Sequence, residues 1–445
     1  MKICVMGTGY VGLVTGACFA EFGVKVTCVD TIQEKVDALC RGEIPIHEPG
    51  LEEVVGRNLK EGRLHFTTDA DAAIRDARVV FIAVGTPSLP DGHADLSYVE
   101  SVATACGRNL NDYKVIVTKS TVPARTGEKV RNWVEAALDE RRDKGEAVPE
   151  FSVASNPEFL REGSAVEDFM RPNRVVLGAE DERALKILKE LYRPLYLIET
   201  PFVETDVVTA ELIKYASNAF LATKISFINE VANLAEVLGA DVHRVARAMG
   251  LDQRISRKFL HAGPGYGGSC LPKDTRALAH IGQENGSPLK LIEATIQVNE
   301  SQLDRMLEKI KRGLGGELEG RTVAVLGLSF KPNTQDTRES RGLELAQKMI
   351  AAGVTVRSHD PVALDEALEH VPEIVRCENA YDAAAGADLV ILATEWNQYR
   401  MLDFEHMKQV VNRAVFLDMR NVYNPETVRE AGFDYEGVGR GGRFG

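Results

Sequence analysis

The chain has 445 residues, of which 44% are hydrophobic and 27% are charged, and its formal net charge is −13. This length predicts roughly two to three globular domains. The acidic balance, without a polybasic block, argues against nucleic acid or an anionic membrane surface as a partner. Met1 leads directly into a strand-like run, so we expect no secretory signal. No apolar run reaches the ~18 residues of a membrane helix.

The cysteine pattern favours a reducing compartment. Seven cysteines are present and none stands in a C-x-x-C pair, so we expect neither a disulfide framework nor a metal site. Cys4 and Cys28 fall in apolar strand patterns and Cys18 in a helical pattern, which predicts small core residues. We therefore expect a cytoplasmic protein.

Short β-rich runs alternate with helical patterns in the first half of the chain. This alternation predicts a parallel sheet with crossover helices, among them helices over 10–22 and 125–142. The expected strands are 2–6, 24–30, 64–67, 79–84, 114–119, 151–155, 175–178 and 195–198.

A single long helix is predicted over 205–238, because apolar residues recur there every three or four positions. Gly239 follows it as the expected left-handed cap. At 1.5 Å per residue such a helix spans roughly 50 Å. A helix of this length is typical of one that links two domains, packs against a symmetry mate, or does both.

A second α/β unit begins near Arg321, after a glycine-rich linker at 313–316. Its expected strands are 322–326, 354–358, 388–393 and 415–418, and the Gly- and Arg-rich residues 438–445 are expected to form a mobile tail. We predict an α/β fold with two Rossmann-like, doubly wound domains joined by a long central helix. The expected boundaries are 1–200, 201–312 and 313–445.

The first turn of the chain has the pattern of a dinucleotide site. Gly7, Gly9 and Gly12 follow a predicted strand and open a predicted helix, where a pyrophosphate rests on the helix N-terminus. Asp30 ends the next strand, in the place of the acid that binds the ribose hydroxyls and repels a 2′-phosphate. The pattern therefore predicts NAD rather than NADP. Small hydroxyl residues after two later strands, Thr86, Ser120 and Thr121, are candidate neighbours of the cofactor or simply turn residues.

Cys270 stands between a glycine-rich segment and a predicted helix start at Pro272. The helix N-terminus favours an anion, so the thiol should ionise more easily than a free one and act as a nucleophile toward a carbonyl. Gly265, Gly267 and Gly268 would let the backbone approach a ligand closely. The alternative is a glycine loop with an ordinary buried cysteine.

Further polar clusters accompany this cysteine. Asp274 is one turn past it, and Lys214 and Asn218 stand four apart on one face of the long helix. Glu158 lies in the acidic segment 156–162 that follows a strand, and the segment 327–333 leaves the first strand of the second α/β unit. Taken singly, Lys214 is more typical of a solvated surface lysine and Glu158 of a solvated loop acid.

Together these motifs closely resemble the UDP-glucose/GDP-mannose dehydrogenase family, from Lys2 to about Asn424, and within it the members that use UDP-glucose. The matching segments are 7–12, 85–87, 120–122, 156–162, 211–230, 263–274 and 327–338.

The resemblance implies that a sugar C6 alcohol is oxidised twice with two NAD to a uronate. Cys270 would then hold the aldehyde as a thiohemiacetal that becomes a thioester. Lys214 and Asn218 would donate to the developing oxyanion. Asp274 would act as base with a water, while Glu158 orients or activates the hydrolytic water and Thr121 helps to hold it.

The resemblance also implies two sets of ligand contacts and the roles of the three expected domains, which are NAD binding, dimerisation with the catalytic cysteine, and UDP-sugar binding. Arg254 is similar to an arginine that reaches a neighbouring subunit's nucleotide, so we expect a homodimer or a higher homo-oligomer. The expected cofactor contacts are Gly7, Gly9, Tyr10, Val11, Gly12, Asp30, Lys35, Thr86, Ser120, Thr121, Glu162 and Arg338. The expected substrate contacts are Glu158, Phe159, Leu160, Arg161, Lys214, Asn218, Arg254, Phe259, Leu260, Gly263, Gly267, Phe330 and Lys331.

Three other functions remain open at this point. A GDP-mannose or UDP-N-acetylmannosamine 6-dehydrogenase would share the mechanism. A two-electron β-hydroxyacid dehydrogenase would share the first domain and the long helix, but would need neither Cys270 nor a second α/β unit. A non-catalytic nucleotide-sugar binding protein would have little physical reason to keep a thiol, an acid and a cation together.

Overall fold

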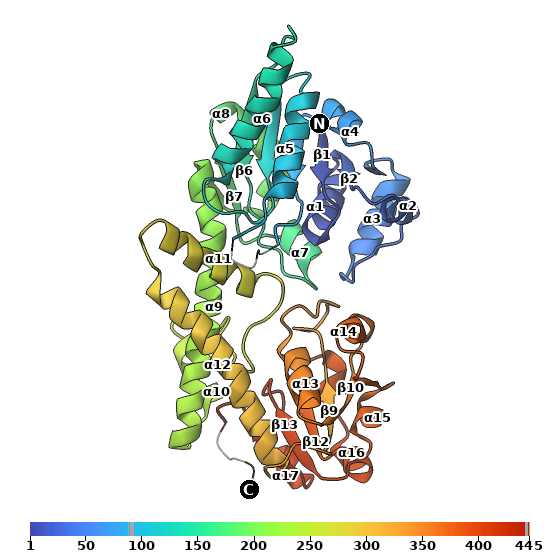
Figure 1. Cartoon of the computed structure of the whole chain (residues 1–445), viewed down its shortest axis with the longest axis vertical. Helices are drawn as coiled ribbons and strands as arrows, with labels where there is room; N and C mark the ends of the chain where they lie inside the picture. Colours follow the sequence, from blue (N-terminus) through green and yellow to red (C-terminus); the bar gives the residue numbers. More distant parts are fainter. Residues whose placement is uncertain (88, 90–92, 441–443, 445) are drawn as a thin grey trace. The chain divides into compact units, whose positions relative to one another are not determined.

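The computed structural model describes residues 1–87, 89, 93–440 and 444, which form two compact units, Met1–Ser217 and Asn218–Gly445 (Figure 1). The prediction of an α/β fold with two doubly wound sheets and a long central helix is confirmed.

The first unit contains an eight-stranded sheet in the order β3-β2-β1-β4-β5-β6-β7-β8. The first six strands are parallel in the Rossmann order. β7 runs antiparallel to β6, and β8 pairs in parallel with β7. The strands are β1 Lys2–Met6, β2 Lys25–Val29, β3 Leu64–Thr67, β4 Val79–Ile82, β5 Lys114–Thr118, β6 Phe151–Ser155, β7 Val175–Ala179 and β8 Phe202–Thr205. The helices are α1 Tyr10–Glu21, α2 Gln33–Cys40, α3 Leu51–Lys60, α4 Ala70–Asp76, α5 Ser97–Asn109, α6 Thr126–Arg142, α7 Ala165–Met170, α8 Glu182–Leu191 and the 3₁₀ helix η1 Arg193–Ile198.

The central strands of this sheet are buried on both faces. In β1, Ile3 and Val5 belong to the core that includes α1 and α3, whereas Cys4 and Met6 belong to the core that includes α5 and α6. Successive side chains of a strand point to opposite faces, so a helix layer on each side explains why the strand is apolar throughout.

The strand expected at 195–198 is wrong. These residues form the end of η1, and β8 occupies the edge of the sheet instead. Pro194 stands in the first turn of η1, where its fixed φ suits a helical turn and its missing N–H could not serve a strand. Leu197 is 88% exposed, so the apolar run at this point does not indicate a buried strand.

One continuous helix, α9 Val207–Leu238, begins in the first unit and ends in the second. It starts two residues later than predicted. Asp206 accepts a hydrogen bond from the Thr209 N–H at 2.8 Å, which satisfies one of the free donors of the first turn. Gly239 adopts a φ of +71°, as expected for the left-handed residue that ends a helix.

The second unit contains a six-stranded parallel sheet in the order β11-β10-β9-β12-β13-β14. The strands β11 and β14 were not predicted. The strands are β9 Thr322–Leu326, β10 Thr355–His359, β11 Val375–Arg376, β12 Leu389–Leu392, β13 Val415–Asp418 and β14 Asp434–Gly437. The helices after α9 are α10 Val242–Gly250, α11 Leu271–Glu284, α12 Lys290–Gly313, α13 Arg341–Ala351, α14 Leu364–His370, α15 Ala380–Ala384, η2 Asn397–Tyr399, α16 Phe404–Val410 and α17 Pro425–Glu430.

In each sheet, the loop that follows the first central strand has the same features. Gly7 and Gly327 have φ values of +99° and +95°. One strand beside each central strand, β2 beside β1 and β10 beside β9, is followed by an aspartate that accepts an N–H group from this loop. In the second unit this aspartate, Asp360, also accepts from the indole of Trp396 at 3.1 Å. The carboxylate of Asp360 is therefore already bonded to the chain's own backbone and indole.

The expectation of a mobile tail from residue 438 onward is wrong for the described part of the tail. Val438 is fully buried and donates its N–H to Asn421 at 2.9 Å, and Gly439 donates its N–H to Glu236 at 2.7 Å. Phe444 is also buried. These contacts fix a segment that its Gly- and Arg-rich composition predicted to be mobile. Residues 441–443 and 445 lie outside the described residues.

The cysteines match the core prediction. Cys4, Cys18 and Cys28 are buried, as are Cys106 and Cys377, and all seven described cysteines are free thiols. Burial raises the pKa of the Cys28 thiol to about 12, so this group is an inert core residue. In the part of the chain that the structure describes, no helix is long and apolar enough to cross a membrane.

Candidate active site

The glycines after β1 separate into two roles. Gly7 and Gly12 serve the turn itself, since an added Cβ would lie 2.7 Å from the carbonyl oxygen of Ala83 at the first and 2.0 Å from that of Gly7 at the second. Gly9 caps α1, and a Cβ there would meet no described atom within 4 Å. With Val11 partly exposed in the first turn of the helix, the open backbone at Gly9 fits a pyrophosphate at the N-terminus of α1.

Asp30 follows β2 and is held as a carboxylate. It accepts hydrogen bonds from the Thr8 N–H at 3.1 Å and from the Lys35 ammonium at 2.8 Å. Burial alone would raise the pKa of Asp30, but Lys35, the Thr8 hydroxyl and the Ile32 N–H outweigh it and bring the pKa to about 2. The fixed negative charge fits ribose hydroxyls and repels a 2′-phosphate.

We expect Asp30→Ala to weaken NADH binding by roughly 10- to 100-fold, the effect of losing a hydrogen bond to a charged group. NADPH binding should change much less, because the substitution also removes a repulsive charge. Titration calorimetry with both cofactors measures the difference, and Asp30→Asn serves as the control of similar shape. A parental protein that prefers NADPH would contradict this interpretation of Asp30.

The hydroxyl residues after β4 and β5 lie together. Thr86 donates its hydroxyl to the carbonyl oxygen of Thr121 at 2.7 Å, and Ser120 donates its hydroxyl to that of Val84 at 2.6 Å. The carboxyl ends of these neighbouring parallel strands are thus joined at the edge where ligands bind in open α/β sheets.

A buried acid that the sequence did not reveal connects the cofactor loop to the segment around Glu162. Glu48 accepts hydrogen bonds from the Tyr10 hydroxyl, from the Gly163 N–H at 2.6 Å and from the Ala165 N–H at 2.7 Å. Tyr10 is therefore engaged in holding this segment. The partners of Glu48 are more than 30 residues away in the sequence, so no local pattern could have identified it.

Glu158 and Lys214 form a buried ion pair, with 2.7 Å between the carboxylate oxygen and Nζ and only 5% of each side chain exposed. The carboxylate also accepts the Leu160 N–H at 2.6 Å. Burial would raise the pKa of Glu158, but Lys214, the Leu160 N–H and the charge of Lys119 hold it below its ordinary value. The structure thus excludes a solvated surface lysine and a solvated loop acid at these positions.

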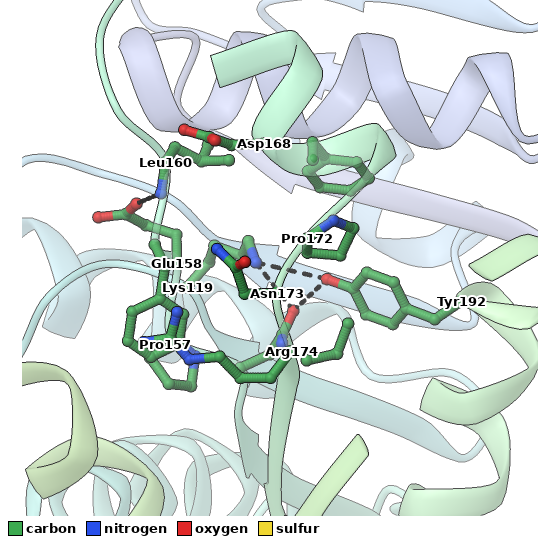
Figure 2. A pocket seen from close by; sticks show the side chains of 13 residues that line it. Lys119, Pro157, Glu158, Leu160, Asp168, Pro172, Asn173, Arg174 and Tyr192 are labelled. Carbon is green, nitrogen blue, oxygen red and sulfur yellow. Dashed lines mark hydrogen bonds between the residues drawn. The ribbon is translucent and has the colours of Figure 1, made fainter. Parts of the chain in front are cut away.

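A cavity opens beside this ion pair in the first unit (Figure 2). Its wall includes Lys119, which is 4% exposed and was not predicted as a site residue. The Arg174 guanidinium stacks 3.4 Å from the centre of the Phe159 ring. The other residues that line the cavity are Asn156, Pro157, Glu158, Leu160, Asp168, Phe169, Pro172, Asn173, Val175 and Tyr192.

Cys270 occupies the N-cap of α11 and is exposed, which excludes an ordinary buried cysteine. Asp274, one turn further, is fully buried and accepts hydrogen bonds from the Asn218 amide at 2.6 Å and from the Lys273 ammonium at 2.7 Å. The predicted helix start is confirmed, since α11 begins at Leu271 with a proline in its first turn. The Lys273 contact was not foreseen.

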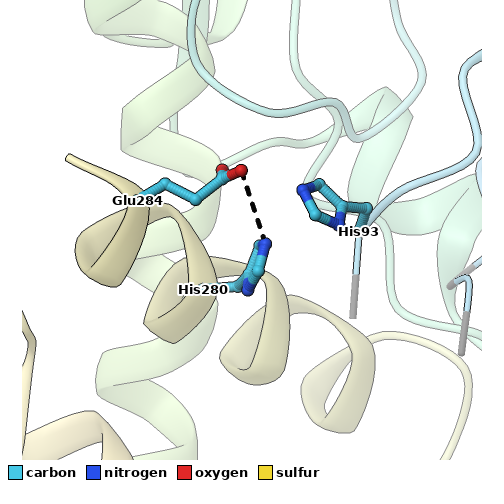
Figure 3. A group of neighbouring side chains, drawn as sticks. All are labelled: His93, His280 and Glu284. Carbon is cyan, nitrogen blue, oxygen red and sulfur yellow. Dashed lines mark ion pairs between the residues drawn. The ribbon is translucent and has the colours of Figure 1, made fainter. Parts of the chain in front are cut away.

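The same helix carries His280 and Glu284 one turn apart, with 3.5 Å between the ring nitrogen and the carboxylate (Figure 3). Pairs at this spacing stabilise a helix by a few tenths of a kcal/mol when the histidine is charged. We assign this pair no part in the chemistry.

The glycines before Cys270 are required by the chain's own packing, whatever they contribute to a ligand. An added Cβ on Gly267 would lie 2.0 Å from the carbonyl oxygen of Glu339, and one on Gly268 would lie 2.6 Å from the Phe330 ring. A Cβ on Gly265 would meet a side-chain oxygen at 2.7 Å. Backbone approaches this close exclude any side chain.

Residues expected to line the UDP-sugar site in the second unit are firmly positioned. Phe259 has a φ of +65° and Leu260 is 4% exposed. Lys331 lies with its ammonium 5.2 Å from the centre of the Phe330 ring. Arg420, which was not predicted, donates to the Phe330 carbonyl oxygen at 2.8 Å and so fixes this loop.

Three arginines expected to meet a ligand each have an acidic partner on the same segment. Their side chains remain 60–89% exposed, so a stronger anionic ligand could still recruit them. The pairs are Arg161 with Asp168, Arg254 with Asp252 and Arg338 with Asp336, at 2.6, 2.6 and 2.7 Å.

The fold and the geometry of the first unit define an NAD-dependent dehydrogenase. The order of the strands, the open backbone at Gly9 and the ionised Asp30 are the features of a dinucleotide site. The second unit adds an exposed thiol beside a buried acid, which a simple hydride-transferring enzyme does not need.

Comparison with known proteins specifies the family. Residues 1–196, 208–301 and 324–425 match the NAD binding, central and UDP binding domains of the UDP-glucose/GDP-mannose dehydrogenase family. The chain is 48% identical to the UDP-glucose 6-dehydrogenase of Rhizobium meliloti, with 99% of this chain and 100% of that one covered. The chain belongs to the UDP-glucose/GDP-mannose dehydrogenase family.

Two solved structures resemble this chain along nearly its whole length. A UDP-glucose dehydrogenase from Pyrobaculum islandicum is 44% identical, with a TM-score of 0.90 and coverage of 99% of this chain and 98% of that one. A UDP-D-ManNAc dehydrogenase from Pyrococcus horikoshii is 26% identical, with a TM-score of 0.85 and 99% of each chain covered.

Proposed function

We propose that this protein oxidises UDP-glucose to UDP-glucuronate in two NAD-dependent steps at C6, with Cys270 as covalent nucleophile. The observation that carries the proposal is the exposed thiol at the N-cap of α11, one turn before the fully buried Asp274. The relatives named for UDP-glucose at 48% and 44% identity support the choice of sugar.

The proposed chemistry assigns each group a separate task. NAD, when bound, supplies the hydride acceptor for each of the two oxidations. The Cys270 thiolate adds to the C6 aldehyde to give a thiohemiacetal, which becomes a thioester on the second oxidation, and water then releases the carboxylate and the thiol. Covalent capture keeps the aldehyde on the enzyme between the two oxidations.

The residues around Cys270 would handle charge and protons. Asn218 already donates to Asp274 at 2.6 Å, and Lys214 stands one turn before Asn218 on the continuous helix α9. We assign both as donors to the oxyanion at C6. Asp274 would accept the hydroxyl proton through a water, while Glu158 orients the hydrolytic water with help from Thr121.

The proposal divides the chain at 1–200, 201–312 and 313–445 into NAD-binding, central and UDP-sugar-binding parts. The matched family segments and the presence of one sheet in each outer part support this division. Lys35, Glu162 and Arg338 complete the proposed cofactor contacts. The proposed substrate contacts are Glu158, Phe159, Leu160, Arg161, Lys214, Asn218, Arg254, Phe259, Leu260, Gly263, Gly267, Phe330 and Lys331.

A homodimer is part of the proposal, because α9 presents an apolar side to solvent. Phe220, Phe227, Leu234 and Leu238 are 65%, 46%, 57% and 70% exposed. Their spacing of seven, seven and four places them on one side of the helix. An aligned apolar surface of this kind is typical of an interface.

Free thiols throughout the described chain support a reducing, cytoplasmic setting.

We expect Arg254→Ala to raise the KM for UDP-glucose by roughly tenfold, the effect of losing one charged hydrogen bond, and to leave the Kd for NAD unchanged. The reason is that Arg254 is proposed to reach the nucleotide of a neighbouring subunit. The matched control is Arg244→Ala, because Arg244 is also an exposed arginine and lies nearby in the sequence, on α10. A fully active protein that sediments strictly as a monomer would refute the shared site.

Substrate choice can be tested by comparing the kcat/KM for NADH formation with UDP-glucose, GDP-mannose and UDP-N-acetylmannosamine. We expect UDP-glucose to lead the others by at least about 100-fold. Guanine would leave polar groups placed for uracil unpaired, and UDP-N-acetylmannosamine, which has the same base, carries an N-acetyl group in place of the sugar 2-hydroxyl that the site is built to bind. A lead by either of the other sugars would replace the proposed substrate while leaving the mechanism intact.

A further inference from the structure

Lys119 is a fully buried lysine at the carboxyl end of β5, immediately before Ser120 and Thr121. Its ammonium donates to the Asn156 side-chain oxygen at 3.0 Å and lies 3.4 Å from the Tyr192 hydroxyl (Figure 2). Tyr192 donates to the same Asn156 oxygen at 2.5 Å. Buried charges of this kind are rare unless they are paired or have a function.

The lysine has no carboxylate of its own. No ion pair within 4 Å is found for Lys119 among the described residues, whereas Glu158 is paired with Lys214. Asn156 stands at the start of the turn that presents Glu158, and its amide donates to the Val176 carbonyl oxygen at 2.9 Å. Lys119 is thus connected to the Glu158 turn through a side chain that is itself 1% exposed.

The ionisable groups that face Glu158 carry more positive than negative charge. The charges of Lys119 and Lys214 both lower the pKa of Glu158. The charge of Glu158 in turn acts to raise the pKa of Arg174, which lies before β7. The ionisable residues that line the cavity are Lys119 after β5, Glu158 after β6, Asp168 on α7, Arg174 before β7 and Tyr192 after α8, and Lys214 on α9 pairs with Glu158.

We infer that Lys119 is a positioning residue of the proposed reaction: its ammonium fixes the Asn156 side chain and the turn that follows, and supplies a second positive charge that keeps Glu158 ionised. This inference rests on the proposed function of Glu158. Lys119 reaches the reaction through Asn156 and Glu158 and is given no contact with substrate.

The ionisation of Lys119 agrees with this role. Burial lowers its pKa to about 7, the Lys214 charge acts in the same direction, and Glu158 opposes them. The lysine is therefore charged across the acidic range in which a glutamate titrates. Removing the charge should raise the pKa of Glu158, since an opposite charge within a few ångströms lowers a carboxyl pKa by about one unit or more.

The test compares the pH profile of kcat with UDP-glucose in three variants, because kcat includes the hydrolysis step in which Glu158 is proposed to act. In Lys119→Met we expect the acidic limb, which reports the ionised Glu158 of the enzyme complex, to move up by about one pH unit. Lys119→Arg keeps a positive charge and should leave the limb in the parental position. Lys114→Met removes another buried lysine, 2% exposed at the opposite end of β5, and should not move the limb.

A second readout does not depend on activity. Because the folded pKa lies near 7 and the ordinary value is 10.5, the native state binds fewer protons than the unfolded state between these pH values. The free energy of unfolding of the parental protein should therefore rise with pH in this window relative to that of Lys119→Met. Lys119→Gln takes the place of the methionine variant if the latter does not fold.

An acidic limb that stays in place in Lys119→Met, or unfolding curves that run parallel over this pH window, would overturn the inference. A parental protein that forms no NADH from UDP-glucose would instead overturn the proposed function, so the two failures are distinguishable.

Discussion

Cys270→Ala should abolish the second oxidation while the first continues at a reduced rate. The first hydride transfer needs no nucleophile, but without the thiol no thiohemiacetal forms to lose the second hydride. We expect the rate of UDP-glucuronate formation to fall by roughly a thousandfold or more, in line with the removal of other covalent nucleophiles. The measurement is the yield of NADH and uronate per UDP-glucose consumed.

The control for this substitution is Cys40→Ala, because Cys40 is the other exposed thiol in the described chain and should be dispensable. Cys270→Ser adds a direct observation. An oxygen ester hydrolyses less readily than a thioester, so an adduct should accumulate on the enzyme and appear in intact-protein mass spectrometry under turnover. If Cys270→Ala still yields two NADH per sugar at a near-parental rate, the cysteine has only a packing role.

Lys214→Met is expected to have the second large effect, on both stability and rate. It leaves the Glu158 carboxylate buried without the partner now 2.7 Å away, and breaking a buried pair in this way costs about 3–5 kcal/mol. It also removes a proposed oxyanion donor, which should lower kcat by roughly 100- to 1,000-fold. Urea unfolding and initial rates of NADH formation measure the two effects.

The double variant Lys214→Met with Glu158→Gln separates stability from catalysis. The neutral glutamine no longer needs a cation, and its amide oxygen can still accept the Leu160 N–H that Glu158 now accepts at 2.6 Å. We expect most of the lost stability to return, since replacing both partners of a buried pair is often close to neutral. Activity should stay low. Recovery of activity together with stability would show that Lys214 serves structure alone.

The sequence was informative about the fold where local pattern and burial agree. The apolar run of β1 predicted a strand because helices cover both faces of the sheet, and Gly239 predicted the end of α9 because its φ is positive. At 195–198 the same reasoning failed, since three of the four apolar side chains are about half exposed or more and Pro194 favours a helical turn. The short strand β11 has no apolar signal of its own.

The candidate site shows the same division. The local settings of Asp30 and Cys270 were predictable because they follow from neighbours in the sequence, a glycine turn and a helix start. Glu48, Lys119 and Arg420 were not, because each acts on a segment at least 37 residues away. The sequence predicted a close approach to the backbone at the glycines before Cys270. The groups that make this approach come from distant parts of the second unit, so the local pattern could not identify them.

The most direct test of the covalent four-electron mechanism is the stoichiometry of the parental protein. A limiting amount of UDP-glucose is consumed with excess NAD, and NADH is counted by absorbance while the sugar products are separated. We expect two NADH for each UDP-glucose, UDP-glucuronate as the sole sugar product, and no aldehyde that a carbonyl reagent can trap. One NADH per sugar, or a free C6 aldehyde in solution, would contradict this mechanism.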